Sequence, residues 1–141
     1  MCKVSIVYWS GTGNTQKMAE AVAEGVKEAG AEADLKFVSA ATVDELAAEP
    51  AFALGCPSMG AEELEDAEME PFMAELESKI SGKKIALFGS YGWGGGEWMR
   101  DWEACSQSAG ATVVNGEGII VNGEPDDDII EELKALGKAL V

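Results

Sequence analysis

The chain has no histidine among its 141 residues, and this absence removes several classes of enzyme. Serine–histidine and cysteine–histidine catalytic pairs need an imidazole to move a proton, and histidine is also a common metal ligand. The three cysteines, Cys2, Cys56 and Cys105, form no CxxC pair, which argues against a disulfide framework or a cysteine zinc site. Any demanding chemistry is therefore expected from a bound cofactor.

Long hydrophobic runs and positive charges are also scarce. No apolar segment approaches the ~18 residues of a membrane span, and the N-terminus shows no secretory pattern, so we expect a cytoplasmic protein that does not enter a membrane. With 10 basic and 26 acidic residues, the net charge of −16 repels nucleic acid and attracts basic proteins, although plain solubility is the alternative explanation. A hydrophobic content of 47% suffices for one core, which predicts a single domain over residues 1–141.

Two apolar patterns alternate along the chain. Short, mostly uninterrupted apolar runs predict buried strands at residues 3–9, 33–38, 51–56, 84–90 and within 112–121. Apolar residues at helical spacing predict helices at residues 13–29, 43–49, 71–81, from after Gly96 to about 109, and from 126 to the end. The alternation predicts an α/β fold with a parallel sheet covered by helices on both faces. Ligands of such sheets bind beyond the carboxyl ends of the strands.

Some buried side chains follow from these patterns. We expect Met18, Val22 and Val26 to face the core from the first long helix, and Trp98, Trp102 and Cys105 to face it from the fourth. Cys56 is expected to be a buried, unreactive thiol, because no cation lies beside it in the sequence.

Loop 1, residues 10–15, follows the first strand and has the composition of a phosphate site. Its members are Ser10, Gly11, Thr12, Gly13, Asn14 and Thr15. Hydroxyl groups and bare N–H groups at a helix N-terminus bind anions without a cation, and Trp9 is expected to pack under them. Gln16 stands where both a Walker motif and a dinucleotide fingerprint need glycine, so neither applies. An ordinary helix N-cap is the alternative interpretation.

Loop 2, residues 56–63, and loop 3, residues 90–96, follow the third and fourth strands. In loop 2, Met59 is suited to cover one face of a flat ring and Gly60 can reorient its peptide, although an ordinary loop explains both. In loop 3, Trp93 lies among glycines and has few neighbours to pack against, so its indole can stack on an aromatic ligand unless it folds back onto the sheet. Together the three loops describe a flat, aromatic ligand with one phosphate.

The three loops resemble the FMN-binding loops of short-chain, clostridial-type flavodoxins. The matching segments are YWSGTGNT at residues 8–15, LGCPSMG at 54–60 and LFGSYGWG at 87–94. The resemblance implies a five-stranded parallel sheet of order 2-1-3-4-5 with helices on both faces. It also implies a monomeric, low-potential one-electron carrier that is not an enzyme. Such a carrier shuttles non-covalently bound FMN between semiquinone and hydroquinone and delivers electrons to redox partner proteins.

The resemblance also assigns roles to residues. Ser10, Thr12, Asn14 and Thr15 would hold the phosphate. Met59 and Trp93 would enclose the isoalloxazine, the Gly60 carbonyl would accept a hydrogen bond from N5–H, and Glu62 would bind N3–H. The remaining expected contacts from loops 2 and 3 are Pro57, Ser58, Ala61, Gly89, Ser90, Tyr91, Gly92 and Gly94. Family members place a phosphate-binding serine where this chain has Pro57, and whether Ser58 replaces it stays open.

The acidic segment Glu62–Glu70 lies beside this expected site. Its members are Glu62, Glu63, Glu65, Asp66, Glu68 and Glu70. They form either a docking ring for basic redox partners or a simple solvated face.

Two alternative functions are disfavoured by the sequence. An FMN-dependent quinone reductase of the same fold needs basic residues for nicotinamide phosphates, which the net charge of −16 opposes. A phosphoacceptor receiver domain needs an aspartate at the end of the third strand, where this chain has Cys56.

Overall fold

The computed structural model describes residues 3–11, 13–58, 65, 67–92 and 96–141. Its strands are β1 (Lys3–Tyr8), β2 (Glu32–Phe37), β3 (Ala51–Gly55), β4 (Lys84–Tyr91), β5 (Thr112–Val113) and β6 (Ile119–Asn122). Its α-helices are α1 (Asn14–Glu28), α2 (Val43–Ala47), α3 (Met69–Leu76), α4 (Glu97–Ser108) and α5 (Asp127–Lys138). None of the helices in the described part of the chain is long and apolar enough to cross a membrane.

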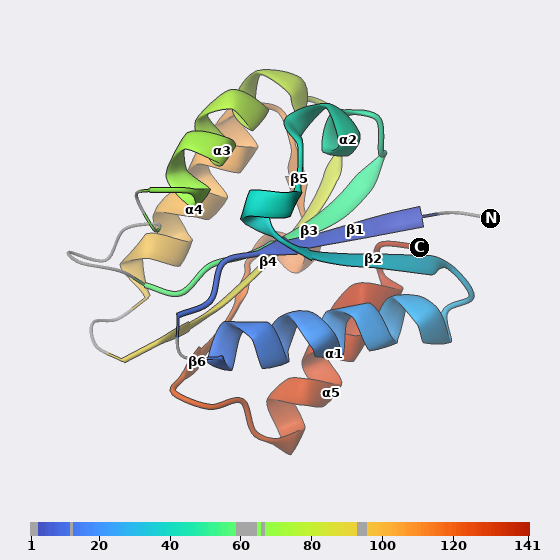
Figure 1. Ribbon diagram of the computed structural model, residues 1–141, viewed down its shortest axis with the longest axis vertical. Coiled ribbons are helices and arrows are strands. Elements are labelled where there is room, and N and C mark those ends of the chain that lie inside the picture. The colour runs from blue at the N-terminus through green and yellow to red at the C-terminus, as the bar shows by residue number, and fades with distance from the viewer. Residues whose placement is uncertain (1–2, 12, 59–64, 66, 93–95) are drawn as a thin grey trace.

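The strands form one parallel sheet between two layers of helices (Figure 1). The order β2-β1-β3-β4-β5 confirms the predicted topology. Helices α1 and α5 pack against one face, and α2, α3 and α4 lie over the other. Because both faces are covered, the central strand β3 is buried at all five of its positions, which explains its uninterrupted apolar sequence.

The predicted fifth strand is broken in two, so the sheet has six strands. Val113 pairs with Ile85 and Ile119 pairs with Phe88, so three positions along β4 correspond to six positions along the broken strand. The extra residues form a tight turn in which Asn115 has a φ of 63° and Gly116 a φ of 78°. Asparagine and glycine tolerate this left-handed conformation better than other residues do, so the Asn-Gly pair ends β5 early.

The two helix layers bury the expected apolar faces with one exception. Met18, Val22 and Val26 are fully buried. The buried residues of α4 are Trp98, Met99, Trp102, Glu103 and Ser106. At roughly 100° per residue, this stripe is centred between Trp98 and Met99, and it leaves Cys105 on the exposed side. The prediction that Cys105 faces inward is therefore wrong.

Helix α3 begins earlier and ends earlier than the predicted range 71–81. It starts at Met69 because Pro71 fits within a first helical turn, where a missing N–H costs no hydrogen bond. It ends at Leu76 and passes into a 3-10 turn over Glu77–Lys79.

Candidate functional site

The carboxyl ends of β1, β3 and β4 meet at one edge of the sheet, as the sequence predicted. Hydrogen bonds tie these ends together beyond the strands: Trp9 N donates to Gly55 O at 3.0 Å. Cys56 N donates to Phe88 O and Ser58 N to Ser90 O, both at 3.1 Å. The described parts of loops 1, 2 and 3 therefore begin side by side.

Loop 1 is organised around the Ser10 hydroxyl. Its oxygen accepts hydrogen bonds from Gly13 N at 3.1 Å and from Gln16 N at 3.3 Å. Gly13 has a φ of 97°, a value that glycine adopts without strain. The loop approaches Trp9 closely, since a Cβ added at Gly11 would lie 3.1 Å from the indole. Trp9 therefore packs against loop 1 as expected, whereas Thr12 lies outside the described residues.

The N-terminus of α1 is electrostatically different from the other helices. Helices α2, α3, α4 and α5 each carry at least one acidic residue in their first turn, and α1 carries none. The N-cap residue Gly13 has no side chain, and the Ser10 hydroxyl accepts from Gln16 N in the first turn. In a chain with 26 acidic residues, the start of α1 thus meets loop 1 without a carboxylate in its first turn, which suits an anion.

The nearest cation does not serve this site. Lys17 forms an ion pair with Glu124 at 2.5 Å, and the hydrogen bond from Lys17 holds the pKa of that exposed carboxylate below its ordinary value. An anion at loop 1 would therefore be held by hydrogen bonds and by the helix dipole.

Two hydroxyl groups near this edge are buried without a partner. Thr15 is 1% exposed and Ser58 is 4% exposed, and neither Oγ1 of Thr15 nor Oγ of Ser58 forms a hydrogen bond within the described structure. A buried hydroxyl without a partner is costly, so a ligand that supplies a hydrogen bond there would be stabilised. Thr15 lies in the first turn of α1, where a phosphate in loop 1 would satisfy it.

Loop 2 starts with a buried thiol. Cys56 has no exposed surface, which confirms that it is buried, and this burial raises the pKa of its thiol to about 12. Met59, Gly60, Ala61 and Glu62 lie outside the described residues, so their expected roles stay predictions.

Loop 3 starts from a well-fixed strand end. Gly89 and Ser90 are buried, and the Ser90 hydroxyl donates to Gly123 O at 2.6 Å. Tyr91 is half-buried, and Gly92 is exposed with open space around its Cα. Trp93 and Gly94 lie outside the described residues.

Glu65 belongs neither to a docking ring nor to a solvated face. It is only 6% exposed, and its carboxylate accepts N–H groups at the start of α3. The donors are Ala67 N at 2.9 Å, Glu68 N at 2.7 Å and Met69 N at 3.0 Å. Burial by itself raises the pKa of Glu65, but these donors outweigh it and hold the pKa below 4.5. Glu65 therefore caps a helix, whereas Glu70 is exposed.

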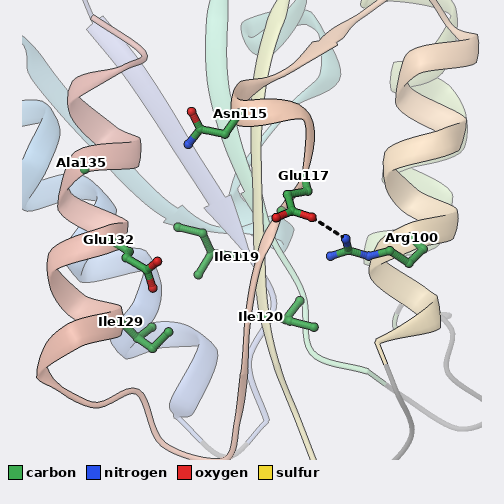
Figure 2. Close-up of a pocket in the computed structure, with 9 residues that line it drawn as sticks. Arg100, Asn115, Glu117, Ile119, Ile120, Ile129, Glu132 and Ala135 are labelled. Carbon is green, nitrogen blue, oxygen red and sulfur yellow. Dashed lines mark hydrogen bonds and ion pairs between the residues drawn. The ribbon is translucent and has the colours of Figure 1, made fainter.

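A separate groove of about 600 Å³ lies beside β6, between α4 and α5 (Figure 2). Ile119, Ile120 and Ile129 line it together with Glu117 and Glu132. Its one basic residue, Arg100, is paired with Glu117 at 3.0 Å. Two carboxylates and a neutralised cation make this groove unsuitable for a phosphate.

These features define a class of protein: an α/β protein with a candidate anion site at the switch point of its strand order. The family model for flavodoxins matches residues 6–136. The flavodoxin of Clostridium beijerinckii is 53% identical over 124 residues, covering 88% of this chain and 89% of the relative. The flavodoxin of Megasphaera elsdenii is 49% identical over 136 residues, covering 96% of both chains. The solution structure of two-electron reduced Megasphaera elsdenii flavodoxin matches with a TM-score of 0.86 at 45% identity, covering 96% of this chain and 98% of that chain.

The chain belongs to the flavodoxin family, in its short-chain, clostridial-type branch. It is an FMN-binding, low-potential electron carrier and not an enzyme, and it acts with redox partner proteins. The unpaired hydroxyl of Thr15 and the acid-free start of α1 fit the phosphate of this cofactor.

The sequence does not predict that Glu65 caps α3. It predicts that Trp98 is a core residue but not that Trp98 donates a hydrogen bond to the Cys56 carbonyl. For Glu65 the sequence carries no distinctive signal, because several neighbouring positions of the segment are also acidic. For Trp98 the sequence carries no signal, because its hydrogen-bond partner lies 42 residues away.

Proposed function

We propose that one domain over residues 1–141 binds FMN with the residues of loops 1, 2 and 3 named from the sequence. FMN, when bound, supplies the one-electron chemistry. The chain's own residues hold the phosphate, orient the ring and exclude water from it. The cytoplasm is the proposed location, since three cysteines without a pairing pattern suit a reducing compartment.

The observation that carries this proposal is the buried, unpartnered Oγ1 of Thr15 at the start of α1. In the absence of a ligand, this group costs stability. A phosphate oxygen at loop 1 would convert it into a charge-assisted hydrogen bond.

The test compares FMN with riboflavin, which lacks the phosphate, on a Thr15→Val variant. Valine keeps the shape of threonine and removes its hydroxyl. We expect FMN affinity to fall about 10- to 100-fold, because a hydrogen bond to a charged group contributes about 1.5–3 kcal/mol. Riboflavin affinity should not change, and the apoprotein should be as stable as wild type or more so. Fluorescence quenching of each flavin gives the affinities.

Ser106 provides the matched control. Its Oγ is also buried without a partner, but it lies near the end of α4, away from the loops. Ser106→Ala should therefore leave the preference for FMN over riboflavin unchanged. An unchanged preference in Thr15→Val would contradict the assignment of Thr15 to the phosphate.

We also propose that Ser58 supplies the phosphate contact that Pro57 cannot make. The support is that its hydroxyl is buried without a partner directly after Pro57. Ser58→Ala should weaken FMN binding more than riboflavin binding. Equal weakening of both flavins would remove Ser58 from the phosphate site.

The acids of the segment Glu62–Glu70 other than Glu65 are the proposed docking face for basic redox partners. Glu65 is not part of this face, because its carboxylate is buried and caps α3. Among the described residues the face includes Glu68, which is half-buried, and Glu70, which is exposed. A negative rim beside a cofactor attracts positively charged proteins and speeds their encounter.

A further inference from the structure

Trp98 lies on the inner face of α4 and is 1% exposed. Its indole Nε1–H donates a hydrogen bond of 3.0 Å to the carbonyl oxygen of Cys56. Cys56 is the first residue of loop 2, so a helix that follows loop 3 in sequence contacts the start of loop 2.

The peptide group between Cys56 and Pro57 has fewer ways than most to form a hydrogen bond. Because residue 57 is proline, the peptide has no N–H, and its carbonyl is its single polar group. Before this peptide Cys56 N donates to Phe88 O, and after it Ser58 N donates to Ser90 O, as in the hydrogen-bond pattern of the sheet. The indole N–H of Trp98 therefore anchors the peptide that lies between these two ladder bonds.

The absence of a side chain at Gly89 lets this carbonyl come close to β4. A Cβ at Gly89 would collide directly with Cys56 O and would lie 3.1 Å from the Trp98 ring. The start of loop 2, the strand β4 and the Trp98 indole thus meet around one carbonyl oxygen.

Trp98 also contacts loop 3. Its ring lies 5.6 Å from the ring of Tyr91, measured between centroids, with an angle of 52° between the planes. Tyr91 ends β4, and its carbonyl accepts a hydrogen bond from Gly123 N at 2.9 Å. One buried side chain therefore contacts the segments from which both ring-covering loops depart.

We propose that Trp98 is a positioning residue for the electron-transfer site: it joins loop 2, through the Cys56 carbonyl, to loop 3, through the Tyr91 ring. Met59 and Trp93, the residues expected on the two faces of the flavin, follow these anchored segments by a few residues. This inference rests on the proposed FMN site. It assigns Trp98 no contact with FMN itself.

Trp102 is a matched control on the same helix. It is 2% exposed, and its Nε1 is buried without a hydrogen-bond partner in the part of the chain that the structure describes. Trp98→Phe and Trp102→Phe both replace a buried indole by a smaller ring, so both leave a similar gap in the core. Only Trp98→Phe removes a hydrogen bond from loop 2.

Amide hydrogen exchange of the full chain tests the link without reference to the flavin. The reporters are the amides of Ser58, bonded to Ser90 O, and Gly123, bonded to Tyr91 O. In Trp98→Phe both should exchange at least about fivefold faster than in wild type, which corresponds to the loss of about one net hydrogen bond. In Trp102→Phe their rates should follow those of amides elsewhere in the sheet.

A redox titration of the FMN-loaded protein provides the functional readout. The two one-electron midpoint potentials should move closer together in Trp98→Phe and stay at wild-type values in Trp102→Phe, because looser loops discriminate less between oxidation states. Equal exchange rates and equal potentials in the two variants would overturn the proposal.

A second variant keeps the test decisive if Trp98→Phe does not fold. Tyr91→Leu removes the ring contact and leaves the hydrogen bond to Cys56, so exchange should accelerate at Gly123 and not at Ser58. Wild-type exchange at Gly123 in this variant would also overturn the link. Failure of the wild-type chain to bind FMN would instead refute the proposed function, and the exchange rates would still decide the role of Trp98.

Discussion

At the scale of single residues, Gly89 shows how closely the backbone packs beneath the site. It lies in the buried strand β4, and a side chain there would overlap the Cys56 carbonyl. We predict that Gly89→Ala destabilises the apoprotein by about 1–3 kcal/mol, because the backbone has to shift to admit a methyl group. Urea denaturation followed by far-UV circular dichroism measures the change.

Gly92 is the control for this prediction. Among the described residues beyond its chain neighbours, no atom lies within 4 Å of a Cβ added there, so Gly92→Ala should leave the unfolding free energy of the apoprotein nearly unchanged. Similar losses in the two variants would mean that the close approach at Gly89 does not limit the fold.

The residues of the site differ in how far the sequence predicts them. Loop 1 is predictable because its composition and its place between a strand and a helix already describe an anion site. The burial of the Thr15 hydroxyl is not predictable, since it depends on how the rest of the chain covers the start of α1. Glu65 carries the same kind of side chain as its acidic neighbours. Only the path of the backbone makes it a helix cap instead of a surface charge.

At the scale of elements, α3 depends on a carboxylate that precedes it. We predict that Glu65→Gln destabilises the protein by about 1–2 kcal/mol, the usual cost of losing a helix cap. Glu75→Gln makes the same charge change at an exposed position of α3 and should stay within about 0.5 kcal/mol of wild type.

The cost of Glu65→Gln should depend on pH. The folded-state pKa of Glu65 lies below 4.5, so its stabilising contribution is fully present above that value and is lost as the pH falls through the folded pKa. The gap in unfolding free energy between wild type and Glu65→Gln should therefore be constant above about pH 5 and should shrink in more acidic solution. A gap that widens on acidification would contradict the assignment.

Apolar periodicity predicts the helices and strands, but it fails for the fifth strand and for the buried face of α4. The run of residues 112–121 reads as one strand by composition, but the Asn115–Gly116 pair inside it favours a left-handed turn. The sequence also predicts that Cys105 faces inward with Trp98 and Trp102. The true stripe also includes Met99 and Glu103, which rotate the buried face away from Cys105.

At the scale of the whole molecule, several basic residues lie at the edge of the sheet opposite the candidate site. Lys3 and Lys84 begin β1 and β4, and Lys83 and Lys138 lie at the same edge, bonded to Glu49 O and Glu28. Lys17 and Arg100 lie nearer the candidate site, and each is paired with a carboxylate. The proposed docking face lies at the other end of the strands from the lysine-bearing edge, so its acids can orient a basic protein before contact.

Two variants with the same net charge test this orientation. Glu70 lies on the proposed docking face, and Glu32 begins β2 at the opposite edge; both are exposed. Glu70→Gln should slow electron transfer to a basic c-type cytochrome about twofold at low ionic strength, since one charge at ~10 Å in water is worth about 0.4 kcal/mol. Glu32→Gln should have a smaller effect.

Stopped-flow measurements over a range of salt concentrations give these rates. Both variants should converge with wild type at high salt, where the charges are screened. Equal slowing by the two substitutions would mean that total charge, and not the docking face, sets the rate.

The broken fifth strand also has a consequence for behaviour at high concentration. A sheet edge offers unpaired N–H and C=O groups that can recruit strands from other molecules and seed aggregates. Here one edge is divided into segments of two and four residues by a left-handed turn, so it presents no long template. The other edge, β2, carries Glu32, Asp34 and Lys36 at alternate positions. Neither border of the sheet is therefore suited to polymerisation, and we expect the folded protein to resist fibril growth even when it is abundant.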